Sequence, residues 1–337
     1  MSGKVRVTIA HIAKEAGVSA PTVSKVINGR PEVAPETRRR VERLLHEHGY
    51  TRRAAGPDGS AGLIDLVFAE LESPWAMELV RGVESVAGEA GASVVITVLH
   101  SHAEPGRDWL DRLAARRTDG VILVGSRLSS RQYGQLGARS IPFVVVDPEG
   151  EPPGDASSVG ATNWHGGLAA TRHLLDLGHR RIGMITGPAG MLCSRARVDG
   201  YRAALETMGV EVDPALIRQG DFLVGSGREQ GHALLSLDDP PTGIFGGSDL
   251  QAFGVLEAAR RLGLRVPDDL SVVGFDDLPL ARSAWPPLTT VHQPLQEMAA
   301  LAARMVLGVS GGDTREPRRV ELATDLVVRE STSAPRT

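Results

Sequence analysis

Short apolar runs alternate with longer helical segments from residue 63 to about residue 275, and this alternation constrains the fold more than any other feature. A strand, a helix and a second strand in succession predict a parallel sheet covered by helices. The first series of expected strands is Leu63–Phe68, Val94–Leu99, Val121–Val124 and Phe143–Val146, with helices beginning near Trp75, Pro105 and Ser129. The second series has strands at Arg181–Ile185, Gly243–Phe245 and Leu270–Phe275, with helices near His165–Gly178, Arg195–Gly209, Ser226–Leu237 and Leu250–Gly263. The pattern therefore predicts an α/β body of two doubly wound parallel sheets.

The first 53 residues have a different character. They carry eleven Lys and Arg side chains against five Glu, a net charge of +6, whereas the whole chain of 337 residues has a net charge of −4. A basic segment attached to an acidic body indicates that the segment meets a polyanion, although a solvated charged terminus would look the same.

Apolar spacing in this basic segment predicts three short helices. The first has its apolar stripe at Ile9, Ile12, Ala13 and Ala16, and Gly17 ends it. Ser19 is placed to cap the second helix, whose apolar face is Val23, Val26 and Ile27. The third is expected from about Pro35 to His48. Two short helices across a glycine-containing turn are typical of a helix-turn-helix, and the alternative is a small helical cap on the larger body.

The string VTIAHIAKEAGVSAPTVSKVING, residues 7–29, closely resembles the DNA-binding headpiece of the lactose-repressor (LacI) family of bacterial transcription regulators. In a helix-turn-helix the start of the second helix faces base edges in the major groove, which makes Ala20, Pro21 and Lys25 the expected specificity positions. The resemblance further implies phosphate contacts from Thr8, Ser19, Thr22, Ser24 and Asn28.

The linker departs from the family. Family members usually continue with a short helix whose leucine opens a minor-groove step, but Thr51–Ala61 has no leucine and contains the turn-forming string GPDG. Arg52 and Arg53 are expected to follow the DNA backbone or to enter a narrow minor groove. Leucine-type kinking of the operator is therefore not expected.

Four strings in the body, LGHRRI at 177–182, RVDGY at 197–201, VVGFDD at 272–277 and LTTV at 288–291, also resemble the LacI family, whose effector domains have the type I periplasmic-binding-protein fold. The resemblance implies three crossings between two lobes, near Gly160, Val291–Gln293 and Leu322–Thr324. The expected organisation is a headpiece at 1–50, a linker at 51–61 and an effector and dimerisation domain at 62–337, with an N-lobe of 62–160 and 292–322 and a C-lobe of 161–291 and 323–332.

Ligands of parallel sheets bind beyond the carboxyl ends of the strands, and the residues expected there suit a carbohydrate. By resemblance, Arg197 and Asp276 are the first candidates for binding hydroxyl groups. The other candidates are Trp75, Asp147, Asn163, Trp164, Phe222, Ser248, Asp249 and Gln293. Structural alternatives stay open: Phe222 and Trp164 as core aromatics, and Asp249 or the Asp276-Asp277 pair as helix caps.

Other function classes have little support. No nucleophile elbow, phosphate-binding glycine loop or metal-ligand spacing is present, so we expect no enzyme activity, no cofactor and no metal. Cys193, the single cysteine, is expected to be a buried thiol. The main rival is a periplasmic sugar receptor, but the N-terminus lacks a signal peptide, and we expect a soluble cytoplasmic protein that spans no membrane.

The expected partners are palindromic operator DNA and a second copy of the chain, because one headpiece buries too little surface for specific affinity. The effector is expected to be a larger stacked ligand such as an oligosaccharide, with a monosaccharide as the alternative and a purine third. The resemblance thus implies a repressor, as a homodimer rather than a tetramer, whose operator affinity a sugar controls.

Overall fold

The computed structural model describes residues 9–27, 32–47, 61–71, 73–99, 107–125, 128–152, 156–310 and 319–336. The chain divides into two compact units, Met1–Gly56 and Pro57–Thr337, which are described separately.

The first unit is a three-helix domain with α1 (Ile9–Ala16), α2 (Ala20–Ile27) and α3 (Pro35–Glu47). Gly17 ends α1 with a φ of +66°, a conformation that glycine adopts without strain. Ser19 precedes α2 and its Oγ accepts a hydrogen bond from the Thr22 backbone N–H at 3.3 Å, as expected of a cap. The core consists of Ile12, Ala13, Ala16, Val23, Val26, Val33 and Val41.

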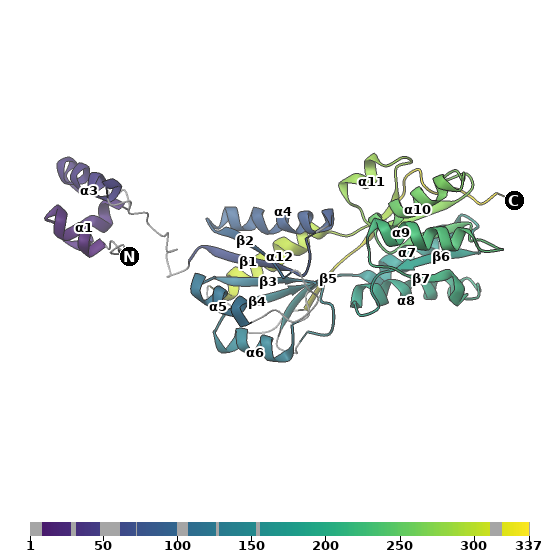
Figure 1. Ribbon diagram of the computed structural model, residues 1–337, viewed down its shortest axis with the longest axis horizontal. Helices are drawn as coiled ribbons and strands as arrows, with labels where there is room; N and C mark the ends of the chain where they lie inside the picture. Colours follow the sequence, from purple (N-terminus) through teal and green to yellow (C-terminus); the bar gives the residue numbers. More distant parts are fainter. Residues whose placement is uncertain are drawn as a thin grey trace, which may run out of the picture. The chain divides into compact units, whose positions relative to one another are not determined.

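The second unit has two lobes, each built on a six-stranded sheet (Figure 1). The N-lobe sheet is parallel throughout, in the order β11-β5-β4-β3-β1-β2. Its strands are β1 (Leu63–Phe68), β2 (Ser93–Val98), β3 (Gly120–Val124), β4 (Phe143–Val146), β5 (Ser157–Ala161) and β11 (Arg319–Leu322). One core cluster lies under α4 (Pro74–Glu89) and α12 (Leu295–Ser310), and another lies under α5 (Arg107–Arg116) and α6 (Ser130–Ala138).

The C-lobe sheet has the order β12-β10-β9-β8-β6-β7, and only its β10–β12 pair is antiparallel. Its strands are β6 (Ile182–Thr186), β7 (Ile217–Gln219), β8 (Gly243–Gly246), β9 (Ser271–Asp276), β10 (Thr289–His292) and β12 (Asp325–Val327). Two core clusters lie on the sheet, one under α7 (Asn163–Asp176) and α8 (Leu192–Thr207), the other under α9 (Val224–Leu235) and α10 (Asp249–Arg261). A short helix, α11 (Pro279–Ser283), follows β9. The two-sheet α/β architecture confirms the fold class expected from the alternation.

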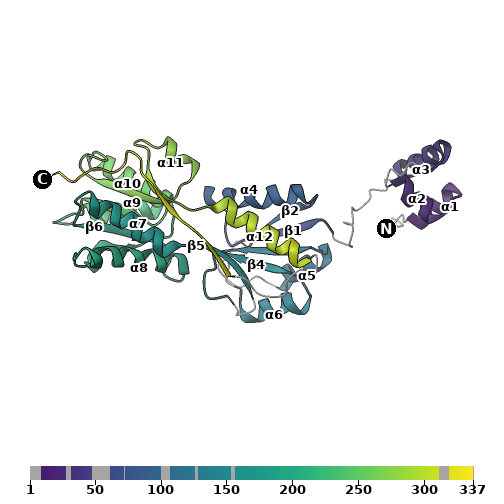
Figure 2. The ribbon, with the colours of Figure 1, turned by 180° about the vertical axis from the view of Figure 1, so that it is seen from behind.

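The chain passes between the lobes three times, from β5 to α7, from β10 to α12 and from β11 to β12 (Figure 2). Thr162 and Thr324 join two of these segments: their hydroxyl oxygens lie 3.0 Å apart, and the Thr324 backbone N–H donates to Thr162 Oγ1 at 3.0 Å. The segments therefore form a hydrogen-bonded hinge.

Several elements lie outside the alternation that the sequence displays. The sequence does not indicate α12, β7 or β12, because α12 follows the last expected strand and the two strands have three residues each. The start of α8 is also corrected: the helix begins at Leu192 rather than near Arg195, and its first turn has no capping side chain that could mark it. Arg197 consequently lies in the second turn of α8.

Candidate functional site

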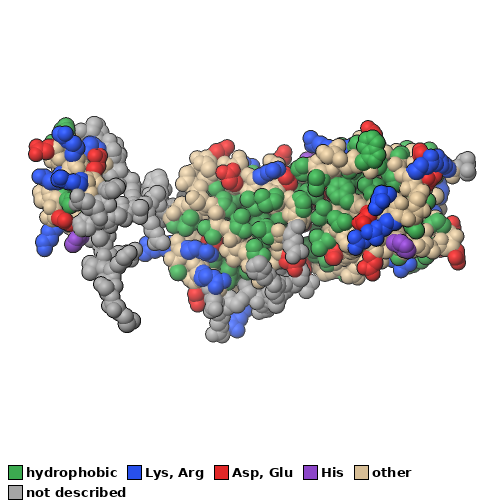
Figure 3. All heavy atoms as spheres, turned by 45° about the horizontal axis from the view of Figure 1, so that its top comes forward, with side chains coloured by type: hydrophobic (Ala, Val, Ile, Leu, Met, Phe, Trp, Pro, Cys, Tyr) green, Lys and Arg blue, Asp and Glu red, His purple; other side chains and the backbone are tan. Residues whose placement is uncertain are grey.

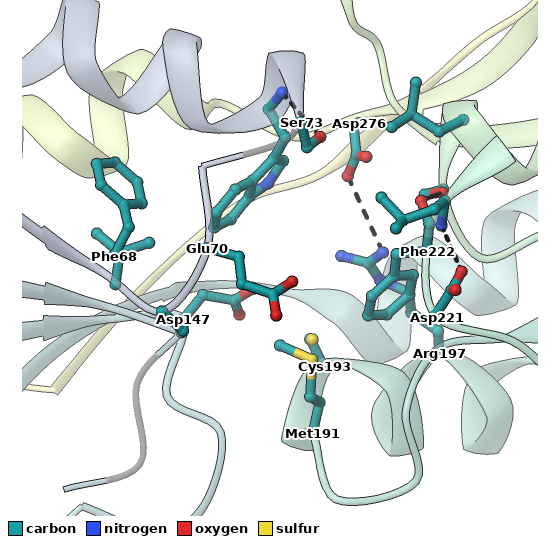
Figure 4. A pocket seen from close by; sticks show the side chains of 17 residues that line it. Phe68, Glu70, Ser73, Asp147, Met191, Cys193, Arg197, Asp221, Phe222 and Asp276 are labelled. Carbon is teal, nitrogen blue, oxygen red and sulfur yellow. Dashed lines mark hydrogen bonds and ion pairs between the residues drawn. The ribbon is translucent and has the colours of Figure 1, made fainter. Parts of the chain in front are cut away.

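A cavity lies between the two lobes, where strands of both sheets end. Its empty volume is about 840 Å³, including its opening to solvent. The N-lobe contributes Phe68, Glu70, Ser73, Trp75 and Asp147, and the C-lobe contributes Met191, Cys193, Arg197, Asp221, Phe222, Ser248 and Asp276. Figure 4 shows Glu70 and Asp147 facing Cys193, Arg197 and Phe222 across the space. We call it the effector cavity.

Arg197 is the central polar group of this cavity, and it is 3% exposed. Its Nε donates to Asn163 Oδ1 at 2.8 Å, its Nη2 donates to Gln293 Oε1 at 3.2 Å, and its Nη1 donates to the Gly247 carbonyl. The guanidinium also lies 3.6 Å from the centroid of the Phe275 ring. A planar group held on several sides is fixed in orientation before any ligand arrives.

Two buried carboxylates flank this guanidinium, Asp276 with Oδ1 4.0 Å from Arg197 Nη1 and Asp147 on the opposite lobe. Burial raises the pKa of Asp276 well above its usual range, and the positive charge of Arg197 opposes this effect. Burial likewise raises the pKa of Asp147, again opposed by Arg197 and by a hydrogen bond from Cys193. The burial of two carboxylates has a free-energy cost that one guanidinium offsets only in part. The site therefore favours ligands that donate hydrogen bonds to these carboxylates.

The backbone at this site is strained in a way that aims the side chains. Asp147, Phe222 and Asp276 have φ values of 50°, 69° and 116°, in the region that residues other than glycine rarely adopt. Asp147 and Asp276 stand where β4 and β9 end, so the left-handed turn directs their carboxylates into the cleft. Such strain is concentrated at binding sites, where the surrounding fold stabilises it.

The apolar lining of the cavity includes the aromatic residues Phe68, Trp75 and Phe222. Trp75 lies in the first turn of α4, which Ser73 caps by accepting from the Trp75 N–H at 3.2 Å. The Phe222 ring lies 5.3 Å from the Arg197 guanidinium. Gly187 makes room for this ring, since a Cβ there would come within 2.0 Å of it. Apolar rings beside fixed polar groups suit the mixed surface of a sugar.

Six of the ten residues expected to bind an effector line this cavity: Trp75, Asp147, Arg197, Phe222, Ser248 and Asp276. Asn163 and Gln293 do not line it; their side-chain oxygens accept hydrogen bonds from Arg197. Asp249 is fully buried and accepts hydrogen bonds from the Leu278 N–H and the Thr290 hydroxyl, while Ser248 is the residue that caps α10. Trp164 belongs to a neighbouring cavity and is 39% exposed. Neither Phe222 nor Trp164 is a core aromatic.

Sequence reasoning missed several lining residues. Glu70 lies two residues after the end of β1, so the strand-end rule that selected Asp147 could have found it. Asp221 precedes Phe222 in the same loop, where its carboxylate accepts from the Leu223 N–H at 2.8 Å. Cys193 is buried, as expected, but it lines the cavity. Burial raises the pKa of its thiol far above the usual range, which keeps it uncharged.

In the helical domain, Ser19, Ala20, Pro21 and Lys25 are exposed, and Thr22 and Ser24 are half-buried. Lys25 Nζ lies 3.6 Å from Glu32 Oε2. Arg39, Arg40 and Arg43 of α3 are exposed, which gives this domain a basic surface. Thr8, Asn28, Arg52 and Arg53 lie outside the described residues.

Two further structural findings concern the described part of the chain. None of its side chains form a group of three or more His, Cys, Asp and Glu placed to hold a metal ion. Within the same ranges, no helix has the length and apolar composition needed to cross a membrane.

Residues 8–53 match the family of bacterial regulatory proteins described as the lacI family, and residues 171–332 match the periplasmic binding protein-like domain. The transcriptional regulator CelR of Thermobifida fusca is 36% identical over 340 residues, covering 98% of this chain and 100% of the relative. DegA of Bacillus subtilis is 34% identical over 335 residues, covering 98% and 99%.

Two solved structures share the fold across almost the whole chain. The CelR–cellobiose complex has a TM-score of 0.74 and 36% identity, covering 97% of this chain and 100% of its own. The lac repressor dimer bound to operator and the anti-inducer ONPF has a TM-score of 0.81 and 28% identity, covering 98% and 100%. These relatives are regulators rather than enzymes, as expected. The chain therefore belongs to the lacI family of bacterial regulatory proteins and is a DNA-binding transcriptional regulator.

Proposed function

We propose that this regulator is a repressor whose operator affinity is controlled by a carbohydrate in the effector cavity. The observation that carries this proposal is the buried Arg197, held by Asn163 and Gln293 and flanked by Asp147 and Asp276. Guanidinium and carboxylate groups bind pairs of hydroxyls, and the rings of Trp75 and Phe222 supply the apolar surface that a sugar face needs. The cellobiose bound to the related CelR supports the same ligand class.

Ligand binding couples to DNA through the arrangement of the lobes. Residues of both lobes line the cavity. A ligand that contacts both lobes binds the closed arrangement more tightly than the open one and therefore shifts the equilibrium toward closure. Three hinge segments absorb the motion. A change in lobe angle alters the spacing of the two headpieces of a dimer and hence the operator affinity.

The operator is read by the start of α2. Ala20, Pro21 and Lys25 are exposed there, and Lys25 is suited to the O6 and N7 acceptors of guanine. Ser19, Thr22 and Ser24, together with Thr8 and Asn28, contact phosphates, and Arg52 and Arg53 follow the backbone. Glu32 must release Lys25 on binding, because an ion pair with a carboxylate competes with the base.

The acting species is a homodimer in the cytoplasm, where operator DNA is found. Exposed apolar side chains occur on both lobes: Met77 and Ile96 on the N-lobe, 49% and 43% exposed, and Leu280 and Trp285 on the C-lobe, 53% and 93% exposed. Figure 3 shows hydrophobic side chains gathered along both lobes on the face turned forward. A large apolar surface of this kind favours an isologous interface with a second copy.

The proposal is tested by gel shifts on the DNA upstream of the protein's own gene, titrated with mono-, di- and trisaccharides and with purines. A sugar that changes the shifted fraction at micromolar to millimolar concentration supports it. A response to purines alone would show that the effector is a purine and not a carbohydrate. The absence of any shift with the protein alone would overturn the repressor assignment.

A further inference from the structure

A second cavity lies next to the effector cavity, on the side formed by the hinge. Its empty volume is about 750 Å³, including its opening. It is lined by the hinge segment from Gly160 to Thr162, the first turns of α7 and α8, and Glu321 of β11. Asp147 and Cys193 line both cavities. The two spaces are therefore neighbours that share a wall.

The second cavity has the chemistry of a sugar site. Trp164, the second residue of α7, is 39% exposed and contacts His165 edge-to-face, with ring centroids 5.0 Å apart, so the indole is not covered by the core. Glu321 is exposed and lines the same space. An aromatic ring with a carboxylate nearby provides both the stacking surface and the hydroxyl acceptor that a pyranose uses.

The shared wall is a contact that a ligand can replace. Asp147 comes from the N-lobe and Cys193 from the C-lobe, and both side chains line the two cavities. A thiol is a weak donor, whereas a sugar hydroxyl is a good one. A saccharide hydroxyl placed between these side chains therefore makes a stronger hydrogen bond to Asp147 than the thiol can.

An occupant of this second space would also act on the rest of the site. Asn163 lines the second cavity, and its side chain connects to the effector cavity, because Nδ2 donates to the Ala161 carbonyl at 3.0 Å while Oδ1 accepts from Arg197. Residues of both lobes line the space, so its occupant is sensitive to the hinge angle in the same way as the effector.

We propose that the second cavity is a further saccharide subsite, joined to the effector cavity across Asp147 and Cys193, in which one sugar unit stacks on Trp164. This inference rests on the proposed carbohydrate function and deepens it, since the effector is then an oligosaccharide that spans both cavities. Its hydroxyl groups donate to Asp147 and Glu321.

The experiment is calorimetric titration of the full chain with a homologous series, from monosaccharide to tetrasaccharide, beginning with glucose and cello-oligosaccharides and repeated with the series selected by the gel shifts. We expect affinity to rise about 5- to 10-fold at the unit that reaches Trp164. Trp164→Ala should remove that increment without changing the affinity for shorter members, and Trp164→Phe should keep most of it. Met208→Ala is the control, because this apolar side chain is 43% exposed, similar to Trp164, and lines neither cavity.

The outcomes separate the two proposals. If no sugar of any series binds, the carbohydrate function itself is overturned, and the subsite with it. If short saccharides bind but longer members gain nothing, or if the gain survives Trp164→Ala, the subsite is overturned and the carbohydrate function stands.

Discussion

Arg197→Ala should cost this protein both stability and effector binding, since the side chain donates to three acceptors and faces two carboxylates. Removing it leaves Asn163 Oδ1, Gln293 Oε1 and the Gly247 carbonyl without their donor. Breaking a buried charged network by deleting one partner costs about 3–5 kcal/mol. The loss of a charged hydrogen-bond partner for sugar hydroxyls, about 1.5–3 kcal/mol, corresponds to a roughly 10- to 150-fold weaker effector affinity.

The stability loss should depend on pH. Without the guanidinium, Asp147 and Asp276 keep the burial that raises their pKa but lose the cation that lowers it. The native variant then binds more protons than the unfolded chain, so its stability falls as pH rises through the raised pKa values. The deficit relative to the wild type should therefore be smaller at pH 5 than at pH 8.

The assay is urea unfolding of both proteins at the two pH values. The effector affinity of both proteins is measured without urea, at a pH midway between those two values. Arg195→Ala is the matched control, because Arg195 lies on the same helix and is exposed. A deficit below about 1 kcal/mol at pH 8, equal to that of the control, would refute the account of Arg197 as the residue around which the site is organised. The operator affinity of the folded variant without effector should be unchanged.

Three further predictions concern other parts of the chain. Lys25→Ala should change the base preference in operator selection, whereas Arg39→Ala should weaken operator and random DNA alike; equal losses on both DNAs for both variants would contradict the assignment. Burial raises the pKa of Asp249 to about 7, so the free energy of unfolding of the wild type should fall as the pH rises from about 4 to about 7. Asp249→Asn should flatten this dependence of the unfolding free energy on pH, as measured by unfolding at a series of pH values. Gly200→Ala should destabilise by about 1–3 kcal/mol, because a Cβ there would lie 2.1 Å from the Trp164 carbonyl oxygen, whereas Gly225→Ala, with nothing within 4 Å, should be nearly neutral in the same thermal unfolding experiment.

The sequence predicts the central strands well because their apolar runs are continuous. The expected ranges Leu63–Phe68 and Phe143–Val146 coincide with β1 and β4. It does not predict α12 or β12, which each follow a crossing between the lobes, or β7, a three-residue edge strand that pairs with β6. The start of α8 is missed because Met191 precedes it without a capping side chain.

The rule that ligands bind where parallel strands end finds Asp147 and Asp276, but it cannot decide which side of a helix start a residue faces. Asn163 and Trp164 are adjacent in sequence at the beginning of α7, yet Asn163 holds Arg197 while the Trp164 ring lies in the second cavity. Asp249 is similar: adjacent to the cap of α10, it is tied to Leu278 and Thr290 by contacts that no local pattern reveals.

The most direct test of effector control is the reciprocity between sugar and DNA. The operator affinity is measured with and without saturating effector, and the effector affinity with and without saturating operator. Because linked binding equilibria are reciprocal, the two fold-changes must be equal, and we expect them in the range of about 5- to 150-fold. An effector that binds in the cavity while leaving the operator affinity unchanged would contradict the account.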